Sequence, residues 1–221
     1  ELKVAEGKTL SLIGGPLEIK NGTIFKTPVT DSYGEWVDVV RSPLLQAAHG
    51  RINLASVASP GEIIPRALGL ERIGLQHLGN ISLTEHAFID VSGAGGGSIY
   101  ILGNNVFIAK GYLWGKTLGA EHGGRIEVQA DNNMELLQGG QVVGNTEGTG
   151  KGSLLHVTAK NLLRVAGYLD RRYANTSGFY ARSGIWITLM GDEIGDGGLI
   201  QLEAKNMLFE NGAETSVSTN S

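Results

Sequence analysis

Apolar and polar residues alternate in short runs along most of the chain, and helical periodicity is rare. The runs include residues 99–101 (IYI), 126–128 (IEV) and 199–202 (LIQL). They are rich in β-branched or aliphatic residues and follow a glycine within a residue or two, as short strands do. The best helical candidate, residues 43–49 (PLLQAAH), is barely two turns long. The pattern therefore predicts an all-β chain.

The alternating runs belong to an internal repeat. Each of four segments has an opening glycine, an alternating run, an asparagine eight or nine residues on, a second short run and a closing glycine. Weaker copies begin at Gly14, Gly50 and Gly79. The opening glycines are Gly97, Gly124, Gly152 and Gly198; the asparagines are Asn105, Asn132 or Asn133, Asn161 and Asn206; the closing glycines are Gly111, Gly139, Gly167 and Gly212.

The spacing of the repeat suits a β-solenoid. The first three clear copies start 27 and 28 residues apart (124 − 97 and 152 − 124). In a solenoid of this period each coil adds two or three short strands, each paired in parallel with its equivalent in the next coil. Alternate apolar side chains then form a continuous stacked core. We predict one β-solenoid domain over residues 1–221, with weaker repeats in 1–96 and clear repeats in 97–221.

The recurring glycines and asparagines are predicted to be structural. The opening glycines would lie at corners, where a positive φ or a close approach of the neighbouring coil requires glycine. The asparagines, with Asn133 favoured in the second copy, would form a ladder of stacked amides or tolerate a left-handed turn. Because an asparagine recurs in every clear copy, a ligand role is disfavoured.

The glycines at Gly93-x-Gly95-x-x-Ser98 resemble a dinucleotide-binding loop. Such a loop opens a helix, and an acidic residue follows about 20 residues later. Here residues 98–102 continue as a strand, and no acidic residue closes the unit. We therefore predict a corner between two coils.

One interruption of the repeat is the best candidate for a binding site. Gly198 follows Gly152 by 46 residues, about 18 more than the preceding period (46 − 28). We predict an insertion at about 168–186, consisting of a partial coil and a projecting loop that runs into a strand at 184–190. Tyr, Trp and Arg anchor interfaces, and aromatic faces stack on sugars, so this loop could contact a protein partner or a glycan. The alternative is that the loop folds down and packs its aromatic residues over the coil wall. The candidate binding residues are Tyr168, Arg171, Arg172, Tyr173, Phe179, Tyr180, Arg182 and Trp186.

Composition narrows the class of protein. The formal net charge of −4 gives no reason to expect nucleic-acid binding or a polybasic membrane attachment. No apolar run approaches the length of a membrane helix, so no membrane insertion is expected. The absence of cysteine suits an exported bacterial surface protein. Because the chain starts inside an apparent strand, we expect a mature product or a fragment.

Candidate chemistry is sparse. The five histidines form no H-x-x-x-H pair, and no cysteine could complete a zinc site. Residues 122–125 (HGGR) and 145–147 (NTE) resemble polygalacturonase elements, but in reversed order and without the Asp-Asp pair. Asp192 and Asp196 are a weak Ca²⁺ candidate, with a solvated acidic turn as the alternative. We expect no catalytic residue, no metal, no cofactor and no enzymatic activity.

Two stretches carry a family resemblance. Residues 2–24 (LKVAEGKTLSLIGGPLEIKNGTI) and 50–63 (GRINLASVASPGEI) resemble the filamentous-haemagglutinin-like exoproteins of bacterial two-partner secretion. The resemblance implies a right-handed parallel β-helix, secreted by a Gram-negative bacterium through an outer-membrane transporter barrel. It also implies a role at the cell surface as an adhesin or filament. Since the Asn-Pro-Asn-Gly-type motifs of the secretion domain are absent, the chain would be a segment just downstream of that domain.

The leading hypothesis is therefore a structural and binding segment of a secreted adhesin or surface filament. It would contact host or neighbour-cell glycans or proteins, and its open sheet edges would allow end-to-end self-assembly. One alternative is a β-helix polysaccharide lyase or hydrolase, which would need clustered acidic residues on one sheet face. Another is the stalk of a contact-dependent toxin exoprotein, whose sequence would look the same.

Overall fold

The computed structural model describes residues 1–30, 36–168, 182–190 and 198–220, and all regular structure in these ranges is β. This confirms the all-β prediction. Residues 43–49, the best helical candidate, contain the short strand β6 (Leu45–Gln46) instead. Within the described ranges, no helix has the length and apolarity needed to cross a membrane.

Most strands follow one another in sets of three along the chain. The two most regular sets are β12 (Ser98–Gly103), β13 (Val106–Ala109) and β14 (Tyr112–Trp114), then β15 (Arg125–Ala130), β16 (Asn133–Leu137) and β17 (Gln141–Val143). They are preceded by β1 (Leu2–Lys3), β2 (Thr9–Gly14), β3 (Leu17–Ile19), β6, β7 (Arg51–Ser56), β10 (Ile81–Leu83) and β11 (Phe88–Asp90). They are followed by β18 (Leu154–Ala166), β19 (Gly184–Met190), β20 (Leu199–Glu210) and β21 (Glu214–Asn220).

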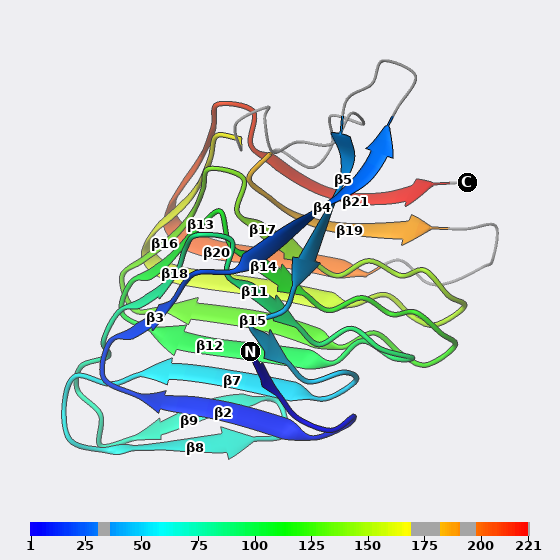
Figure 1. The fold of residues 1–221 in the computed structure, drawn as a ribbon. Helices are drawn as coiled ribbons and strands as arrows, with labels where there is room; N and C mark the ends of the chain where they lie inside the picture. Colours follow the sequence, from blue (N-terminus) through cyan, green and yellow to red (C-terminus); the bar gives the residue numbers. More distant parts are fainter. Residues whose placement is uncertain (31–35, 169–181, 191–197, 221) are drawn as a thin grey trace.

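These strands form two parallel sheets. The seven-stranded sheet has the order β1-β6-β11-β14-β17-β19-β21. The ten-stranded sheet has the order β2-β7-β12-β15-β18-β16-β13-β10-β3, with β20 paired to β18. The first part of β18 pairs with β15 and the second part with β16, so this long strand joins the two halves of the sheet. Figure 1 shows β2, β7, β12 and β15 lying one above another.

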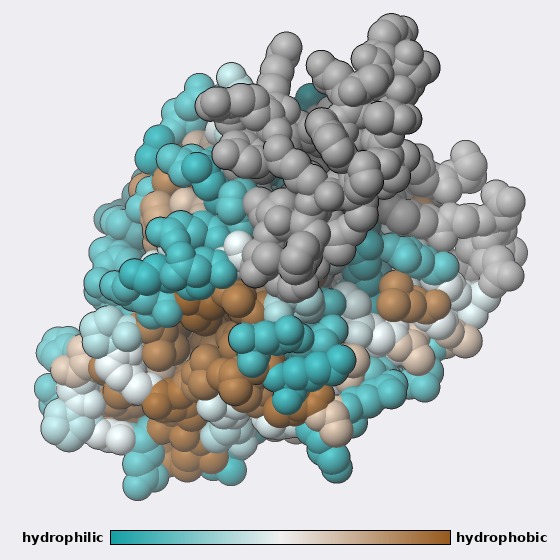
Figure 2. All heavy atoms as spheres, viewed as in Figure 1, coloured by the Kyte–Doolittle hydropathy of each residue, from teal (hydrophilic) through white to brown (hydrophobic). Residues whose placement is uncertain are grey.

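Equivalent residues of successive repeats are paired in register. Ile126, for example, pairs with Ile99 on one side and with Leu155 on the other. We call the full set the core row: Leu10, Ile52, Ile99, Ile126, Leu155 and Ile200. Its four inner members are almost completely buried, while Leu10 and Ile200 at the two ends are only partly buried. Figure 2 shows apolar surface gathered near the N-terminus, in the region of β1 and β2. Stacked rows of this kind make up the main hydrophobic core.

The opening glycines are explained by close backbone approach. A Cβ on Gly124 would lie 1.9 Å from the carbonyl oxygen of Gly97, and one on Gly97 would lie 2.5 Å from that of Gly50. A Cβ on Gly198 would similarly lie 2.3 Å from the oxygen of Ser153. The backbone around Gly152 is equally close to its neighbour, because a Cβ on Gly123 would lie 2.6 Å from its carbonyl carbon. Stacked repeats therefore leave no room for side chains at this corner.

The asparagines form hydrogen-bonded steps from repeat to repeat. The Asn105 Nδ2 donates to Asn80 Oδ1 at 3.0 Å, and Asn132 Nδ2 donates to Asn105 Oδ1 at 3.0 Å. Asn161 Nδ2 donates to Asn133 Oδ1 at 2.9 Å, so Asn132 and Asn133 both take part. In the last step, Asn206 Nδ2 donates to the backbone carbonyl oxygen of Asn161 at 3.3 Å. These contacts correspond to the amide ladder, and none of these residues has a positive φ.

Asn105 is an informative position in the ladder because it both donates and accepts. We expect Asn105→Ala to lower the free energy of unfolding by about 1–3 kcal/mol, since Asn80 and Asn132 each lose a partner. Asn105→Asp keeps the shape but sets two acceptor oxygens against each other. Chemical denaturation at neutral pH measures both costs, and no loss in either variant would contradict a stabilising ladder.

Two hairpins leave the parallel sheets, so the expectation of a single insertion was incomplete. Strands β4 (Thr23–Thr30) and β5 (Trp36–Ser42) form one antiparallel hairpin, and β8 (Glu62–Arg66) and β9 (Gly69–Ile73) form the other. They lengthen the first two repeats, whose core-row residues Leu10, Ile52 and Ile99 are 42 and 47 residues apart (52 − 10 and 99 − 52). Strands such as β8 (EIIPR) and β9 (GLERI) lack strict alternation of apolar and polar residues, so the alternating pattern did not predict them.

Candidate functional site

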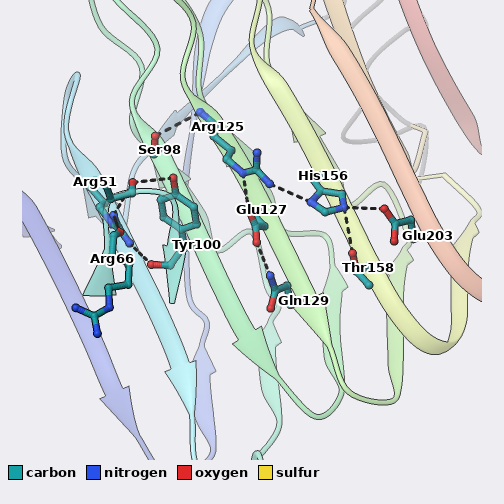
Figure 3. A network of polar contacts seen from close by, with 12 residues as sticks. Arg51, Arg66, Ser98, Tyr100, Arg125, Glu127, Gln129, His156, Thr158 and Glu203 are labelled. Carbon is teal, nitrogen blue, oxygen red and sulfur yellow. Dashed lines mark hydrogen bonds and ion pairs between the residues drawn. The ribbon is translucent and has the colours of Figure 1, made fainter. Parts of the chain in front are cut away.

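A network of polar side chains covers the outer face of β7, β12, β15, β18 and β20 (Figure 3). Alternate residues of these strands face the core, so the residues between them face outward. Parallel register brings together residues that lie far apart in the sequence; Glu127, for example, is paired with His156. We call this network the polar face: Arg51, Ser98, Tyr100, Arg125, Glu127, Gln129, His156, Thr158 and Glu203.

Glu127 is the buried charge of the polar face, with only 5% of its surface exposed. Arg125 Nε and Gln129 Nε2 each donate a hydrogen bond to its carboxylate. Both donors lie on the same strand, two residues before and two residues after Glu127. A buried carboxylate is tolerated when a cation and further donors compensate it, and β15 supplies both.

His156 connects three strands. Arg125 Nη2 lies 3.1 Å from His156 Nδ1, and because a guanidinium can only donate, Nδ1 is the acceptor. The proton of a neutral ring is then on Nε2, which lies 3.2 Å from Thr158 Oγ1 and 3.3 Å from Glu203 Oε1. Both ring nitrogens of His156 are thus engaged within the protein.

The hairpin β8–β9 packs on the polar face beside Glu127. Arg51 donates to the carbonyl oxygen of Gly69 at 2.7 Å and of Ala67 at 3.2 Å, and also to that of Arg66. Its guanidinium carbon lies 4.1 Å from the ring centroid of Tyr100. Burial lowers the pKa of Arg51, against the opposing effect of Tyr100 and Glu127. The guanidinium therefore fixes the turn of the hairpin onto the sheet.

A small apolar cluster and an ion-pair group hold the rest of the hairpin. The cluster contains Ala55, Leu78 and Leu102, with Ile63, Leu70 and Leu75 packed against it. Asp131 accepts from Arg72 Nη1 on β9 and from Lys160 Nζ, each at 2.6 Å. Burial acts to raise the pKa of Asp131, but the hydrogen bonds and charges of Arg72 and Lys160 outweigh it and lower the pKa.

The lowered pKa of Asp131 predicts an acid-sensitive attachment of the hairpin. A group with a lowered folded-state pKa contributes stability above its unfolded pKa, about 3.8, and loses it as pH falls through the folded value. We expect Asp131→Asn to be less stable than the unmodified chain at neutral pH, with the difference closing as the pH falls below 3.8 and through the lowered folded-state pKa of Asp131. Denaturation midpoints at several pH values measure this difference. Glu6→Gln, at an exposed residue, is the control; a pH-independent difference for Asp131→Asn would contradict the prediction.

The sequence-predicted binding residues are only partly within the described ranges. Tyr168 is 60% exposed and forms an antiparallel bridge with Arg182, whose Nη1 lies 3.2 Å from Glu214 Oε2. Trp186 belongs to the regular strand β19, and its ring lies over Gly184, 2.2 Å from where a Cβ would be. The strand at 184–190 was predicted and is confirmed. The other five residues, Arg171, Arg172, Tyr173, Phe179 and Tyr180, and the Ca²⁺ candidates Asp192 and Asp196, lie outside the described residues.

The polar face was missed by sequence reasoning, although a signal exists. Arg51, Ser98 and Arg125 each follow an opening glycine, so aligning the repeats would have placed them side by side. On β15 the outward positions two and four residues later hold Glu127 and Gln129, and on β12 the position two residues later holds Tyr100. Single segments read alone show only polar residues in alternating runs.

The side chains of the polar face can form hydrogen bonds and ion pairs. Within the described ranges, no group of three or more His, Cys, Asp or Glu side chains could hold a metal ion. Glu127 and Glu203 lie on either side of His156, and Glu127 accepts hydrogen bonds from Arg125 and Gln129.

No protein family model, curated protein or solved structure matches the chain.

Proposed function

We propose that this chain is a rod-like segment of a secreted bacterial adhesin or surface filament, folded as a right-handed parallel β-helix. The observation that carries the proposal is the in-register continuation of parallel strands from β1–β3 to β20–β21. Each added repeat lengthens such a stack by about 4.8 Å and contacts only its neighbours. An architecture of this kind suits a spacer that holds binding surfaces away from a cell.

The proposed role is spacing and binding rather than catalysis. The polar side chains of the outer face are engaged with one another and with the hairpin β8–β9, which favours a rigid surface. Exposed Tyr168, at the edge of the predicted insertion, is suited to stacking on a glycan or a protein partner. In this proposal the chain reaches the cell surface through an outer-membrane transporter barrel.

Immunogold labelling tests the location. Antibodies raised against the purified 221-residue chain are applied to intact and to permeabilised cells of the producing bacterium. We expect label on intact cells, on thin projections or close to the envelope. Label that appears only after permeabilisation would contradict a secreted adhesin. Negative-stain images of the labelled native material then distinguish a long filament from a short rod.

A further inference from the structure

The chain contains two Asn-Gly dipeptides, Asn21-Gly22 and Asn211-Gly212, and they occupy different environments. Asparagine followed by glycine is the dipeptide in which the next backbone nitrogen most easily reaches the side-chain carbonyl carbon, because glycine has no Cβ to obstruct it. Both asparagines are exposed and have a positive φ, 64° for Asn21 and 53° for Asn211. Because the two asparagines are alike in these respects, the sites differ mainly in the surroundings of the glycine that follows each of them.

Gly22 is held tightly by the neighbouring repeat. Its N–H donates to the carbonyl oxygen of Glu85 at 2.9 Å. A Cβ on Gly22 would lie 1.7 Å from the carbonyl oxygen of His86, so the backbones are in close contact there. Cyclisation at Asn21 needs this N–H to be released and the backbone to rotate, and the packing against Glu85 and His86 opposes both.

Gly212 lies in an open turn between β20 and β21. The turn is closed by Ala213 N donating to the carbonyl oxygen of Glu210 at 3.2 Å, with positive φ at Asn211 and, at 80°, at Gly212. These features are those of a two-residue turn of the Asn-Gly type. Gly212 is exposed, and no atom lies within 4 Å of where its Cβ would be. Rotation about the Asn211–Gly212 backbone is therefore unobstructed by neighbouring repeats.

We propose that Asn211 is a site of spontaneous deamidation, whereas Asn21 is protected by the fold. The backbone nitrogen of Gly212 loses its proton and attacks Cγ of Asn211; the N–Cγ bond forms, the Cγ–Nδ2 bond breaks, and ammonia leaves. Water then opens the cyclic imide at one of its two carbonyls, which yields an aspartyl or an isoaspartyl residue. The net change is water consumed and ammonia released, without any oxidation.

The product alters the last turn of the described structure. A new negative charge appears between Glu210, which pairs with Arg164 at 2.7 Å, and Glu214, which pairs with Arg182 at 3.2 Å. The isoaspartyl form also adds one methylene to the backbone of a two-residue turn. Both changes destabilise the turn between β20 and β21. Deamidation would therefore accumulate with the age of the protein and weaken the packing at this end of the sheets.

Mass spectrometry of the aged, purified chain tests the proposal. The chain is incubated in mildly alkaline buffer, digested, and both Asn-Gly peptides are quantified over time. We expect deamidation at Asn211 several-fold faster than at Asn21 in the folded protein, with an isoaspartyl product resolved by chromatography. In a denaturant-unfolded sample the two rates should become similar, because Asn21 then loses its protection. Equal rates in the folded chain, faster reaction at Asn21, or an unreactive Asn211 would each overturn the proposal.

Discussion

Gly124→Ala is expected to destabilise the protein by more than about 4 kcal/mol, or to prevent folding. The added methyl group would lie 1.9 Å from the carbonyl oxygen of Gly97 and 2.4 Å from that of Gly96. Both obstacles are backbone atoms, so no change of side-chain rotamer relieves the clash. The repeats would have to separate at this corner, and the hydrogen bonds between β12 and β15 would be lost with it.

Gly15→Ala is the matched control for this substitution. Nothing lies within 4 Å of where a Cβ on Gly15 would be, and its φ is not positive. Replacing glycine at a compatible position restricts mainly the unfolded chain, so we expect Gly15→Ala to be neutral or to stabilise by up to about 1 kcal/mol. Urea denaturation of the three proteins gives the comparison. Similar costs for both alanines would mean that the close approach at Gly124 is not the reason for its glycine.

The repeat made the parallel sheets predictable from sequence. Strands β12, β15, the first part of β18 and β20 all begin within two residues of an opening glycine, at Gly97, Gly124, Gly152 and Gly198. An apolar residue recurs two or three residues after each of these glycines, because each must stack on its equivalent. A periodic constraint therefore appears in the sequence as a periodic pattern.

The hairpins and the polar face could not be predicted in the same way. The strands of the hairpin β8–β9, EIIPR and GLERI, lack the strict alternation of the repeat strands, and only their pairing in space shows that they are antiparallel. The contacts that hold it, such as Arg51 with Gly69 and Arg72 with Asp131, join segments up to 59 residues apart without a shared motif. Outward residues of a repeat are free to vary, since the core does not constrain them.

The second large effect is expected for an inner residue of the core row. Leu155 is fully buried between Ile126 and Ile200, whereas Leu10, at the end of the same row, contacts only Ile52 along the row and is partly exposed. Leu155→Ala removes the same atoms as Leu10→Ala but leaves a cavity closed on both sides. We expect a loss of about 2–5 kcal/mol for Leu155→Ala and less than half of that for Leu10→Ala.

This pair of alanine variants separates a stacked architecture from a single globular core. If each layer interacts only with its neighbours, the cost of a cavity depends on how many layers contact it, and an end position has one fewer. Hydrogen exchange adds a spatial readout: Leu10→Ala should increase exchange in β2 and β7, and leave β18 and β20 unchanged. Equal losses in the two variants, or increased exchange throughout the sheets with Leu10→Ala, would show that the layers unfold as one unit. A stack with local energetics can gain or lose repeats at little cost to the others, which is the property that the proposed adhesin rod requires.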